Sequence, residues 1–193
     1  NHITGDVHFL SYMLARDKTL LTILDCVAMY NTSGLKRSLI RILWYVIPEK
    51  RVKLISVISE STKNELVKFI SCDPNKIRVI PVCISPGYFK TPKDFNSAKP
   101  RILQVGTAKN KNLERLIEAL EGVPCTLHIV GKLSSQQLSV LREKKIEYSS
   151  SSKLPESELI EKYKECDLVT FVSTYEGFGM PIIEAMRSGT PVI

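Results

Sequence analysis

The sequence predicts an α/β protein built on parallel sheets, and three observations lead to this prediction. Short runs of apolar and β-branched residues alternate with stretches of helical periodicity, as strands and crossover helices do in a parallel sheet. The alternation stops at the proline-bearing segment 85–100 and restarts beyond it. In the last strand–helix unit, residues 167–186, a buried strand leads through a glycine-containing turn into a helix that opens at Pro181.

The part before the proline-bearing segment contains three predicted strands, at 19–27, 52–59 and 77–82. The chain starts in a loop that leads into a helix around 9–14. Another helix follows the second strand, because Thr62 with Glu65 three residues later forms a capping-box pattern.

Residues 34–51 form a predicted amphipathic helix. Its apolar and basic side chains lie on different faces. The apolar residues Leu35, Leu39, Leu43 and Val46 share one face, and the basic residues Lys36, Arg37 and Arg41 lie elsewhere. A basic helix that also bears aromatic residues can lie in a membrane surface. Alternatively, its apolar face packs on the core while its basic residues are solvated, and the sequence leaves both interpretations open.

Beyond the proline-bearing segment, strands and helices are predicted in strict alternation, at 101–105, 112–120, 126–130, 135–143, 146–148 and 155–166. The last of these helices would bury Leu159, Ile160, Tyr163 and Cys166. Residues 190–193 read as the start of a further strand. We therefore predict two domains, 1–84 and 101–193, joined by an interdomain linker at 85–100.

The composition narrows the range of partners. The formal charge of +7 suits an anionic partner, whether a nucleoside diphosphate, an acidic membrane or a nucleic acid. No RNP-like aromatic string, helix-turn-helix signal or zinc-finger spacing supports nucleic acid. No window approaches about 18 uninterrupted apolar residues, which argues against a membrane-spanning helix.

The cysteines indicate the redox compartment. All five are scattered without a CxxC pair, and no histidines stand at metal-ligand spacing. This pattern predicts buried free thiols in a reducing compartment and no metal site.

A ligand site is predicted where three loops meet. In an open parallel sheet, ligands bind outside the carboxyl ends of the strands. Three such loops are visible: residues 105–112, 130–132 and 173–179. Lys109 and Lys111 stand on the first loop, where their ammonium groups would meet phosphate, although two loop lysines can also be merely solvated.

The last loop would bind an anion at a helix N-terminus. It brings Gly177, Phe178, Gly179 and Met180 to the start of the helix, where N–H groups and the helix dipole favour negative charge. The two glycines allow a close approach of the backbone to a ligand because they carry no Cβ atom.

Two carboxylates, Glu176 and Glu184, frame this turn. Carboxylates accept protons from hydroxyl groups, such as those of a sugar or ribose. Phosphate on the amides and hydroxyls on the glutamates together describe a nucleotide sugar. The alternative is that Glu184, in the first helical turn, only complements the helix dipole and that Glu176 is a solvated loop residue.

The string EGFGMPIIEAMRSGTPVI, residues 176–193, resembles the signature of the retaining glycosyltransferases of family four. Those enzymes have the GT-B fold of two facing Rossmann-like domains with parallel sheets. Three more stretches resemble the family, namely VISESTKNEL, PVCISPGYF and VGTAKNKNLERLIEAL. On this resemblance, the N-terminal domain is incomplete, the C-terminal domain is truncated, and the chain lacks both ends.

The resemblance implies transfer of a sugar from a nucleoside diphosphate sugar to an acceptor, with retention of configuration and without metal or cofactor. The acceptor would be a glycan or a lipid-linked glycan, in polysaccharide, lipopolysaccharide or glycolipid synthesis. The enzyme would act in the cytoplasm, with a peripheral membrane contact through 34–51 left open, and without nucleic acid.

The resemblance also implies roles for residues. Glu184 would bind the ribose hydroxyls and Glu176 the transferred sugar, while the amides of Phe178, Gly179 and Met180 would face the sugar and diphosphate. Lys111 would neutralise the phosphates, and Gly106 would also belong to the donor-binding site. Lys109 would replace an arginine that relatives carry where this chain has Thr107. The nucleobase would lie near Gly131 and the loop 152–155.

One departure from the family concerns catalysis. Relatives commonly have a histidine facing the reacting centre where this chain has Leu24, whereas Asp25 remains. His8 or His2 would have to fill that space, and we take His8 as the candidate. The departure keeps open a non-catalytic nucleotide-sugar-binding module or an inactive truncated homologue. An epimerase or phosphorylase of the same fold is disfavoured by the EGFG string.

Overall fold

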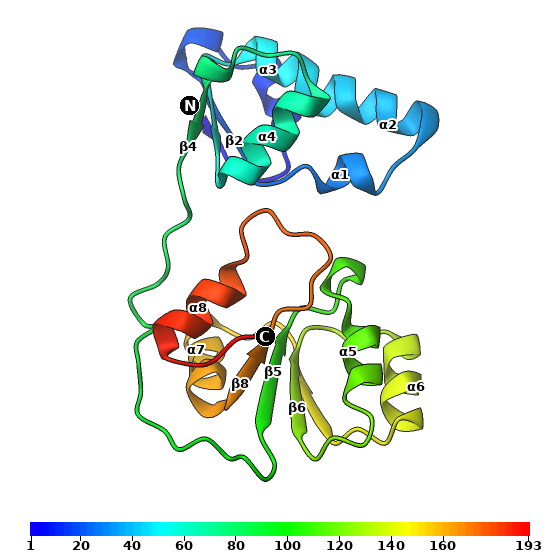
Figure 1. The fold of residues 1–193 in the computed structure, drawn as a ribbon. Helices are drawn as coiled ribbons and strands as arrows, with labels where there is room; N and C mark the ends of the chain where they lie inside the picture. The colour runs from blue at the N-terminus through cyan, green and yellow to red at the C-terminus, as the bar shows by residue number, and fades with distance from the viewer. The chain divides into compact units, whose positions relative to one another are not determined.

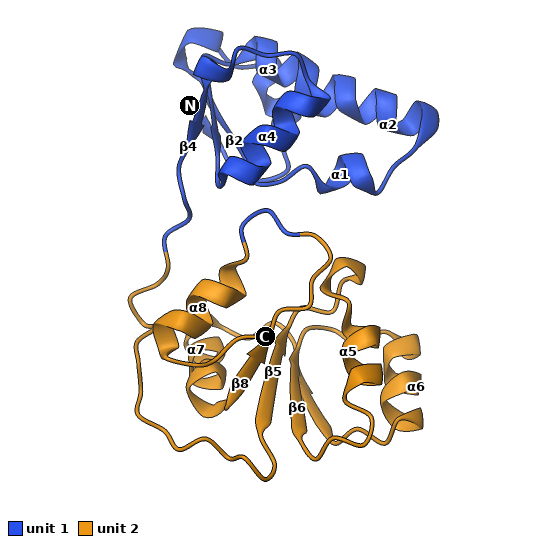
Figure 2. Ribbon diagram, in the orientation of Figure 1, with its two compact units in different colours: residues 1–83, 176–178 blue, residues 84–175, 179–193 orange.

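The computed structural model describes residues 1–193 and divides into two compact units (Figure 2). Unit 1 comprises residues 1–83 and 176–178, and unit 2 comprises residues 84–175 and 179–193. Each unit contains a four-stranded sheet with helices around it (Figure 1). All strand pairs are parallel, as the alternating pattern predicted.

The sheet of unit 1 has the order β1-β2-β3-β4. Its strands are β1 (His2–Ile3), β2 (Leu20–Ile23), β3 (Leu54–Val57) and β4 (Ile77–Val79). The α-helices are α1 (Val27–Tyr30), α2 (Gly34–Ile40), α3 (Ile47–Arg51) and α4 (Glu60–Phe69). The π-helical segment η3 (Arg41–Val46) joins α2 to α3, and the 3-10 segments are η1 (His8–Tyr12), η2 (Arg16–Lys18) and η4 (Pro74–Lys76).

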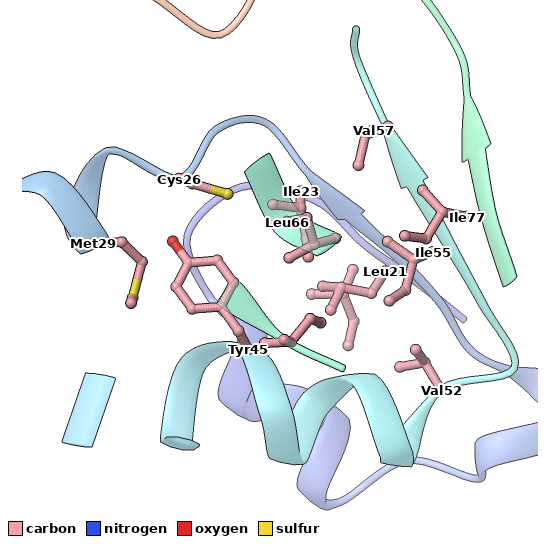
Figure 3. Close-up of a cluster of buried hydrophobic side chains, with 12 residues drawn as sticks. Leu21, Ile23, Cys26, Met29, Tyr45, Val52, Ile55, Val57, Leu66 and Ile77 are labelled. Atoms are coloured by element: carbon pink, nitrogen blue, oxygen red, sulfur yellow. The ribbon is translucent and has the colours of Figure 1, made fainter. Parts of the chain in front are cut away.

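The core of unit 1 covers both faces of β3. Ile55, Ser56 and Val57 are all buried, which is typical of a parallel strand with elements packed on each side. Figure 3 shows apolar side chains of β2 and β3 beside Tyr45 of η3 and Leu66 of α4. The polar member of the strand is satisfied, because the hydroxyl oxygens of Ser56 and Thr22 lie 2.6 Å apart.

Several predicted element bounds in unit 1 were wrong, and two of the differences have a clear physical cause. The helix α4 begins earlier than predicted, because Ser59 caps it with its hydroxyl, which accepts a hydrogen bond from the Thr62 amide at 3.0 Å. Thr62 therefore lies inside the helix. The strand predicted at 19–27 ends at Ile23, because the Asp25 carboxylate accepts a hydrogen bond from the Val27 amide at 2.9 Å and turns the chain into α1.

The helical run 34–51 is only partly packed on the core. Tyr45 is buried, whereas two leucines of the predicted apolar face are exposed, Leu35 at 85% and Leu39 at 56%. Ile40, Trp44 and Val46 also pack against the core, so the core-packing interpretation holds for these residues but not for Leu35 and Leu39. None of the helices combines the length and the apolar character that crossing a bilayer requires.

The sheet of unit 2 has the order β7-β6-β5-β8. Its strands are β5 (Arg101–Val105), β6 (Thr126–Val130), β7 (Tyr148–Ser151) and β8 (Leu168–Thr170), and Val192 adds a parallel bridge to Val169. The helices are α5 (Leu113–Ala119), α6 (Ser135–Glu143), α7 (Glu156–Glu165) and α8 (Met180–Ser188), with the 3-10 segment η5 (Lys109–Lys111).

Unit 2 has two apolar layers, one on each face of the sheet. Ile102 packs with α5 and α6, whereas its neighbour Leu103 packs with α7 and α8, because successive side chains of a strand point to opposite faces (Figure 1). The helix α7 buries Ile160, Tyr163 and Cys166, as predicted, and Leu159 is partly buried.

The segment 84–100 contains no helix or strand and packs on unit 2. Tyr88 is 2% exposed, and its ring meets that of Tyr163 edge-on at 5.4 Å. The Lys93 ammonium donates to the carbonyls of Tyr163 (3.1 Å) and Cys166 and to the Thr190 hydroxyl (2.8 Å). The segment predicted as a linker thus groups with unit 2, and the predicted domain limits stay predictions.

An ion pair with a buried carboxylate joins the starts of two strands in unit 2. The Asp167 side chain is fully buried and accepts hydrogen bonds from Arg101, namely from the backbone N (2.8 Å), Nε (3.0 Å) and Nη2 (3.2 Å). Burial alone would raise the pKa of Asp167, but the hydrogen bonds and charge of Arg101 outweigh it and lower the pKa.

The cysteines form no disulfide. Cys26, Cys125 and Cys166 are buried as predicted, but Cys83 is exposed because it lies in the irregular segment after β4. Burial raises the pKa of Cys26 to about 12, which keeps this thiol protonated and unreactive at neutral pH.

Candidate functional site

Hydrogen bonds join the three loops at the carboxyl ends of β5, β6 and β8. The Thr107 hydroxyl donates to the Lys132 carbonyl at 2.8 Å, which ties the β5 loop to the β6 loop. The Thr174 amide donates to the Asn110 carbonyl at 2.8 Å, and the Asn112 side chain donates to the Val172 carbonyl at 3.1 Å. These two bonds tie the β5 loop to the β8 loop. The structure therefore brings Gly106, Lys109, Lys111 and Gly131 to one edge of the sheet.

Gly106 and Gly131 leave space for side chains of the β5 loop. A Cβ atom on Gly106 would lie 2.8 Å from Cε of Lys111, so the Lys111 side chain runs along the Gly106 backbone. A Cβ atom on Gly131 would lie 2.7 Å from Cγ2 of Thr107. The backbone of Gly106 is also left-handed, at φ 96°, which favours glycine.

Gln104 lies under the loop 105–112, which carries Lys109 and Lys111 and is called the lysine loop below. Gln104 was not identified from the sequence. This side chain is 1% exposed, and its amide nitrogen lies 3.4 Å from the carbonyl oxygens of Gly106 and Lys111. Its amide oxygen accepts a hydrogen bond from the Thr170 hydroxyl at 2.7 Å. The sequence did contain a sign of this role, because Gln104 is a polar residue inside the apolar strand RILQV and needs hydrogen-bond partners when it is buried.

The N-terminus of α8 carries no side-chain cap. Gly179 is the N-cap residue with left-handed backbone angles (φ 86°, ψ 45°), followed by Met180 and Pro181 in the first turn. The first N–H groups of an α-helix have no partner within the helix, and the dipole concentrates positive potential there. This end of α8 can therefore hold an anionic group close to its backbone.

The position of Glu184 in the helix differs from the predicted one. It was predicted in the first helical turn, but α8 begins at Met180 and has no acidic residue in its first turn. Glu184 lies one turn further on and is 9% exposed. Its Oε2 atom accepts a hydrogen bond from the Tyr163 hydroxyl at 2.6 Å. A surface carboxylate that only complements the helix dipole does not fit this burial.

Residues 176–178 group with unit 1, unlike the rest of the predicted donor site. Within unit 1, the Gly177 carbonyl accepts a hydrogen bond from the Ser59 hydroxyl at 2.7 Å. Glu176 and Phe178 are half-buried. How these residues lie relative to Lys111 and Glu184 stays a prediction.

Unit 1 contains a pocket of about 140 Å³ beside the end of β2. Both residues that bear on catalysis, His8 and Leu24, line this pocket. The other lining residues are Gly5, Asp6, Asp25, Val27, Ala28 and Tyr45. His2 does not line it, because this side chain lies on β1 with Nε2 2.6 Å from the Thr22 hydroxyl. Of the two histidines considered for the space of Leu24, His8 alone shares its pocket.

His8 is fixed as a neutral imidazole. Its ring is 4% exposed, and Nδ1 lies 2.7 Å from the Trp44 carbonyl oxygen. Because a carbonyl only accepts, Nδ1 carries the proton and Nε2 carries the lone pair. Burial lowers the pKa of His8, so the ring stays uncharged near neutral pH and can accept a hydrogen bond through Nε2.

No group of three or more His, Cys, Asp or Glu side chains in the structure is arranged to hold a metal ion. The polar groups of the two sites are instead hydroxyls, amides, ammonium groups, one imidazole and carboxylates. Such groups suit hydrogen bonding to sugars and charge pairing with phosphate.

Residues 89–193 match the family model described as glycosyl transferases group 1. The chain is 28% identical over 168 residues to the MMP alpha-(1->4)-mannosyltransferase of Mycolicibacterium hassiacum, covering 78% of this chain and 40% of that protein. It is 29% identical over 152 residues to the O-antigen chain mannosyltransferase RfbU of Salmonella typhimurium, covering 75% and 42%. The chain thus spans about two fifths of the length of these curated relatives.

Solved structures of low sequence identity share the fold. Anabaena HepE in complex with UDP and glucose superposes with a TM-score of 0.78 at 18% identity, covering 96% of this chain and 54% of that one. WaaG, a glycosyltransferase involved in lipopolysaccharide biosynthesis, gives a TM-score of 0.72 at 18% identity, covering 92% and 56%. These likenesses confirm the predicted GT-B fold class with its parallel α/β units.

Proposed function

We propose, from the premise that the chain belongs to the family of group 1 glycosyl transferases, that the full-length protein transfers a sugar from a nucleoside diphosphate sugar to a glycan or lipid-linked acceptor. One observation carries the proposal: the lysine loop, two glycines, the uncapped start of α8 and a buried carboxylate all belong to unit 2, at or beside the carboxyl ends of its strands. The names of the relatives support it, since two are mannosyltransferases and one structure holds UDP and glucose.

In this proposal, the donor's diphosphate meets Lys109, Lys111 and the N-terminus of α8. The diphosphate gains negative charge as its bond to the sugar breaks, so positive groups already fixed around it stabilise the transition state. Glu184 accepts hydrogen bonds from the ribose hydroxyls, and the nucleobase lies near Gly131. Glu176 and the amides of the turn at Phe178 bind the transferred sugar, with retention of configuration and without metal.

The pocket at His8 is proposed to receive the hydroxyl group of the acceptor. Nε2 of a neutral imidazole can accept a hydrogen bond from an attacking hydroxyl and hold its proton as the new bond forms. This arrangement would supply the group that is missing at Leu24. The pocket volume of about 140 Å³ admits part of an acceptor sugar rather than a whole chain.

Transfer assays on the full-length protein test the function. Radiolabelled UDP-glucose, UDP-galactose and GDP-mannose are offered together with a glycan acceptor, and label is expected to pass from one donor to the acceptor. Glu176→Ala is expected to lower the rate about 100-fold or more, on the scale of losing one group that stabilises a transition state. Donor binding without transfer in the wild-type protein would favour the non-catalytic module instead.

An exposed apolar face on unit 1 supports a peripheral membrane contact. We define this face by exposed residues of η1, of the position that follows it, and of α2 and η3, namely Phe9, Leu10, Met13, Leu35, Leu39, Ile42 and Leu43. The segments adjoin, because the Tyr12 hydroxyl donates to the Leu43 carbonyl and the rings of Phe9 and Trp44 lie 5.8 Å apart.

The charge of the same run suits an anionic bilayer. Five basic residues of 34–51 are exposed, namely Lys36, Arg37, Arg41, Lys50 and Arg51. The acidic residue of the run, Glu49, is paired with Lys76 at 2.8 Å. Apolar side chains between basic residues bind the interface of anionic lipids. The proposal therefore places the protein in the cytoplasm at the inner face of the membrane.

Vesicle sedimentation tests the membrane contact. The wild-type protein is expected to sediment with vesicles of phosphatidylcholine and phosphatidylglycerol in equal parts, but much less with phosphatidylcholine alone. Leu35→Asp with Leu39→Asp should weaken this binding more than about tenfold, since burying one leucine side chain stabilises by about 1.5–3 kcal/mol. Val123→Asp, a change at an exposed apolar residue of unit 2, serves as the control. Equal sedimentation of the double variant and the wild type would refute the contact.

A further inference from the structure

We infer that Tyr163, supported by Tyr88, is a positioning residue for nucleotide binding: its hydroxyl holds the Glu184 carboxylate in the orientation that receives the ribose hydroxyls of a nucleoside diphosphate. The inference rests on the proposed function of Glu184. It assigns the role to a residue of α7, which lies outside the loops of the site.

The hydrogen bond between Tyr163 and Glu184 is short and buried. The Tyr163 hydroxyl lies 2.6 Å from Glu184 Oε2, within the range of an O–H donor bound to a carboxylate. Tyr163 is 0% exposed and Glu184 is 9% exposed, so little water competes for either group. In a site of low polarity this bond fixes the side-chain angles of the glutamate.

Tyr88 fixes the ring that makes this bond. Its own ring meets that of Tyr163 edge-on, with centroids 5.4 Å apart and an interplanar angle of 83°. The segment that carries Tyr88 is anchored through Lys93, whose ammonium donates to the carbonyls of Tyr163 and Lys164 at 3.1 and 3.3 Å. Two separate contacts therefore hold Tyr163 in place.

Both tyrosines remain donors under ordinary conditions. Burial first, and then the charge of the neighbouring Glu184 carboxylate, raise the pKa of Tyr163 and of Tyr88. Their hydroxyls stay protonated, so the carboxylate remains an acceptor. An ionised carboxylate offers about four lone-pair sites on its two oxygens, and the hydroxyls of Tyr163 and Tyr88 occupy two of them. Capacity therefore remains for the two hydroxyls of a ribose.

The position of Glu184 along α8 agrees with a role toward the ligand. Glu184 follows Met180 by four residues, so both lie on the same face of the helix, about one turn apart. A diphosphate at the uncapped helix start would leave its ribose within reach of a carboxylate on this face. A purely structural core would place an apolar residue at this buried position at lower cost.

The test compares nucleotides that differ only in the ribose hydroxyls. UDP and GDP are titrated calorimetrically into the full-length protein beside their 2′,3′-dideoxy analogues. Tyr163→Phe is expected to weaken binding of the better ribonucleotide about tenfold, the scale of one hydrogen bond to a charged group, and to leave its dideoxy analogue unchanged. In a Glu184→Ala background the same change is expected to have no further effect.

Tyr148→Phe is the matched control, because it removes a tyrosine hydroxyl from β7 of the same unit and should leave both affinities unchanged. Equal losses for the ribose and dideoxy forms in Tyr163→Phe would mean that the tyrosine supports the fold alone, and would overturn the inference. So would an unchanged affinity for both. A wild-type protein that does not distinguish ribose from dideoxyribose would instead contradict the proposed role of Glu184.

Discussion

Replacing Glu184 with alanine is expected to weaken nucleoside diphosphate binding at least about 100-fold. Two hydrogen bonds from ribose hydroxyls to a carboxylate are lost, and each contributes about 1.5–3 kcal/mol. The loss is large because the carboxylate is 9% exposed and already oriented by Tyr163, so water replaces it poorly. Calorimetric titration with UDP and GDP measures the effect.

The Glu184→Ala change is also expected to lower the free energy of unfolding, so stability must be measured together with nucleotide affinity. Alanine leaves the Tyr163 hydroxyl buried without its present acceptor, which costs about 1–3 kcal/mol. Urea denaturation of the same sample shows whether it is folded under the titration conditions. Glu156→Ala, at an exposed position of α7, is the control and should bind as the wild type does. An unchanged affinity of the folded Glu184 variant would remove the ribose role.

Replacing Asp167 with alanine is expected to lower the free energy of unfolding by about 3 kcal/mol at pH 7. The buried carboxylate accepts three hydrogen bonds from Arg101, one of them from a backbone N–H that then loses its partner. Breaking a fully buried pair costs about 3–5 kcal/mol, and the lower end applies because the Arg101 side chain is 51% exposed and can be hydrated.

The pH dependence of this effect has a defined sign. The pKa of Asp167 is lowered in the folded protein from its ordinary value of 3.8. Its contribution is therefore fully present above the unfolded pKa and is lost as the pH falls through the folded one. Wild type and variant should converge in urea denaturation below that range. Glu161→Ala, which breaks an exposed pair with Lys164, should cost at most about 1 kcal/mol. A difference between wild type and the Asp167 variant that persists unchanged in acid would contradict this account.

Parts of unit 2 could be predicted from the sequence residue by residue. The strands at 101–105 and 126–130 have the predicted bounds, because Pro100 precedes the first and a glycine ends each. The helix at 135–143 also has its predicted bounds, since Ser134 and Gln137 form a capping box. In each case local chemistry alone determines where the element begins or ends.

Other elements depend on contacts that a sequence does not display. The strand predicted at 146–148 lies at 148–151, because three serines hide the apolar pattern and pairing with β6, such as Leu127 with Tyr148, decides the register. In unit 1, the sequence pattern predicted Thr62 as the helix cap, but Ser59, an equally good capping residue, caps α4 in the structure.

The candidate site divides in the same way. Its glycines, its lysines and the uncapped helix start were visible because each belongs to a local pattern of strand, turn and helix. The contact between Tyr163 and Glu184 joins residues 21 positions apart and depends on how α7 and α8 pack. The contacts of Gln104 with the carbonyl oxygens of Gly106 and Lys111 likewise depend on how the loop after β5 lies against this strand.

The bonds made by Thr107, Asn112 and Thr174 have a consequence for how the donor would be captured. They join the three loops at the carboxyl ends of β5, β6 and β8, so these loops are already held in the arrangement to which the proposal assigns the diphosphate. Little conformational entropy would then be lost on association. In the proposed function, this arrangement favours binding of the nucleoside diphosphate part of the donor.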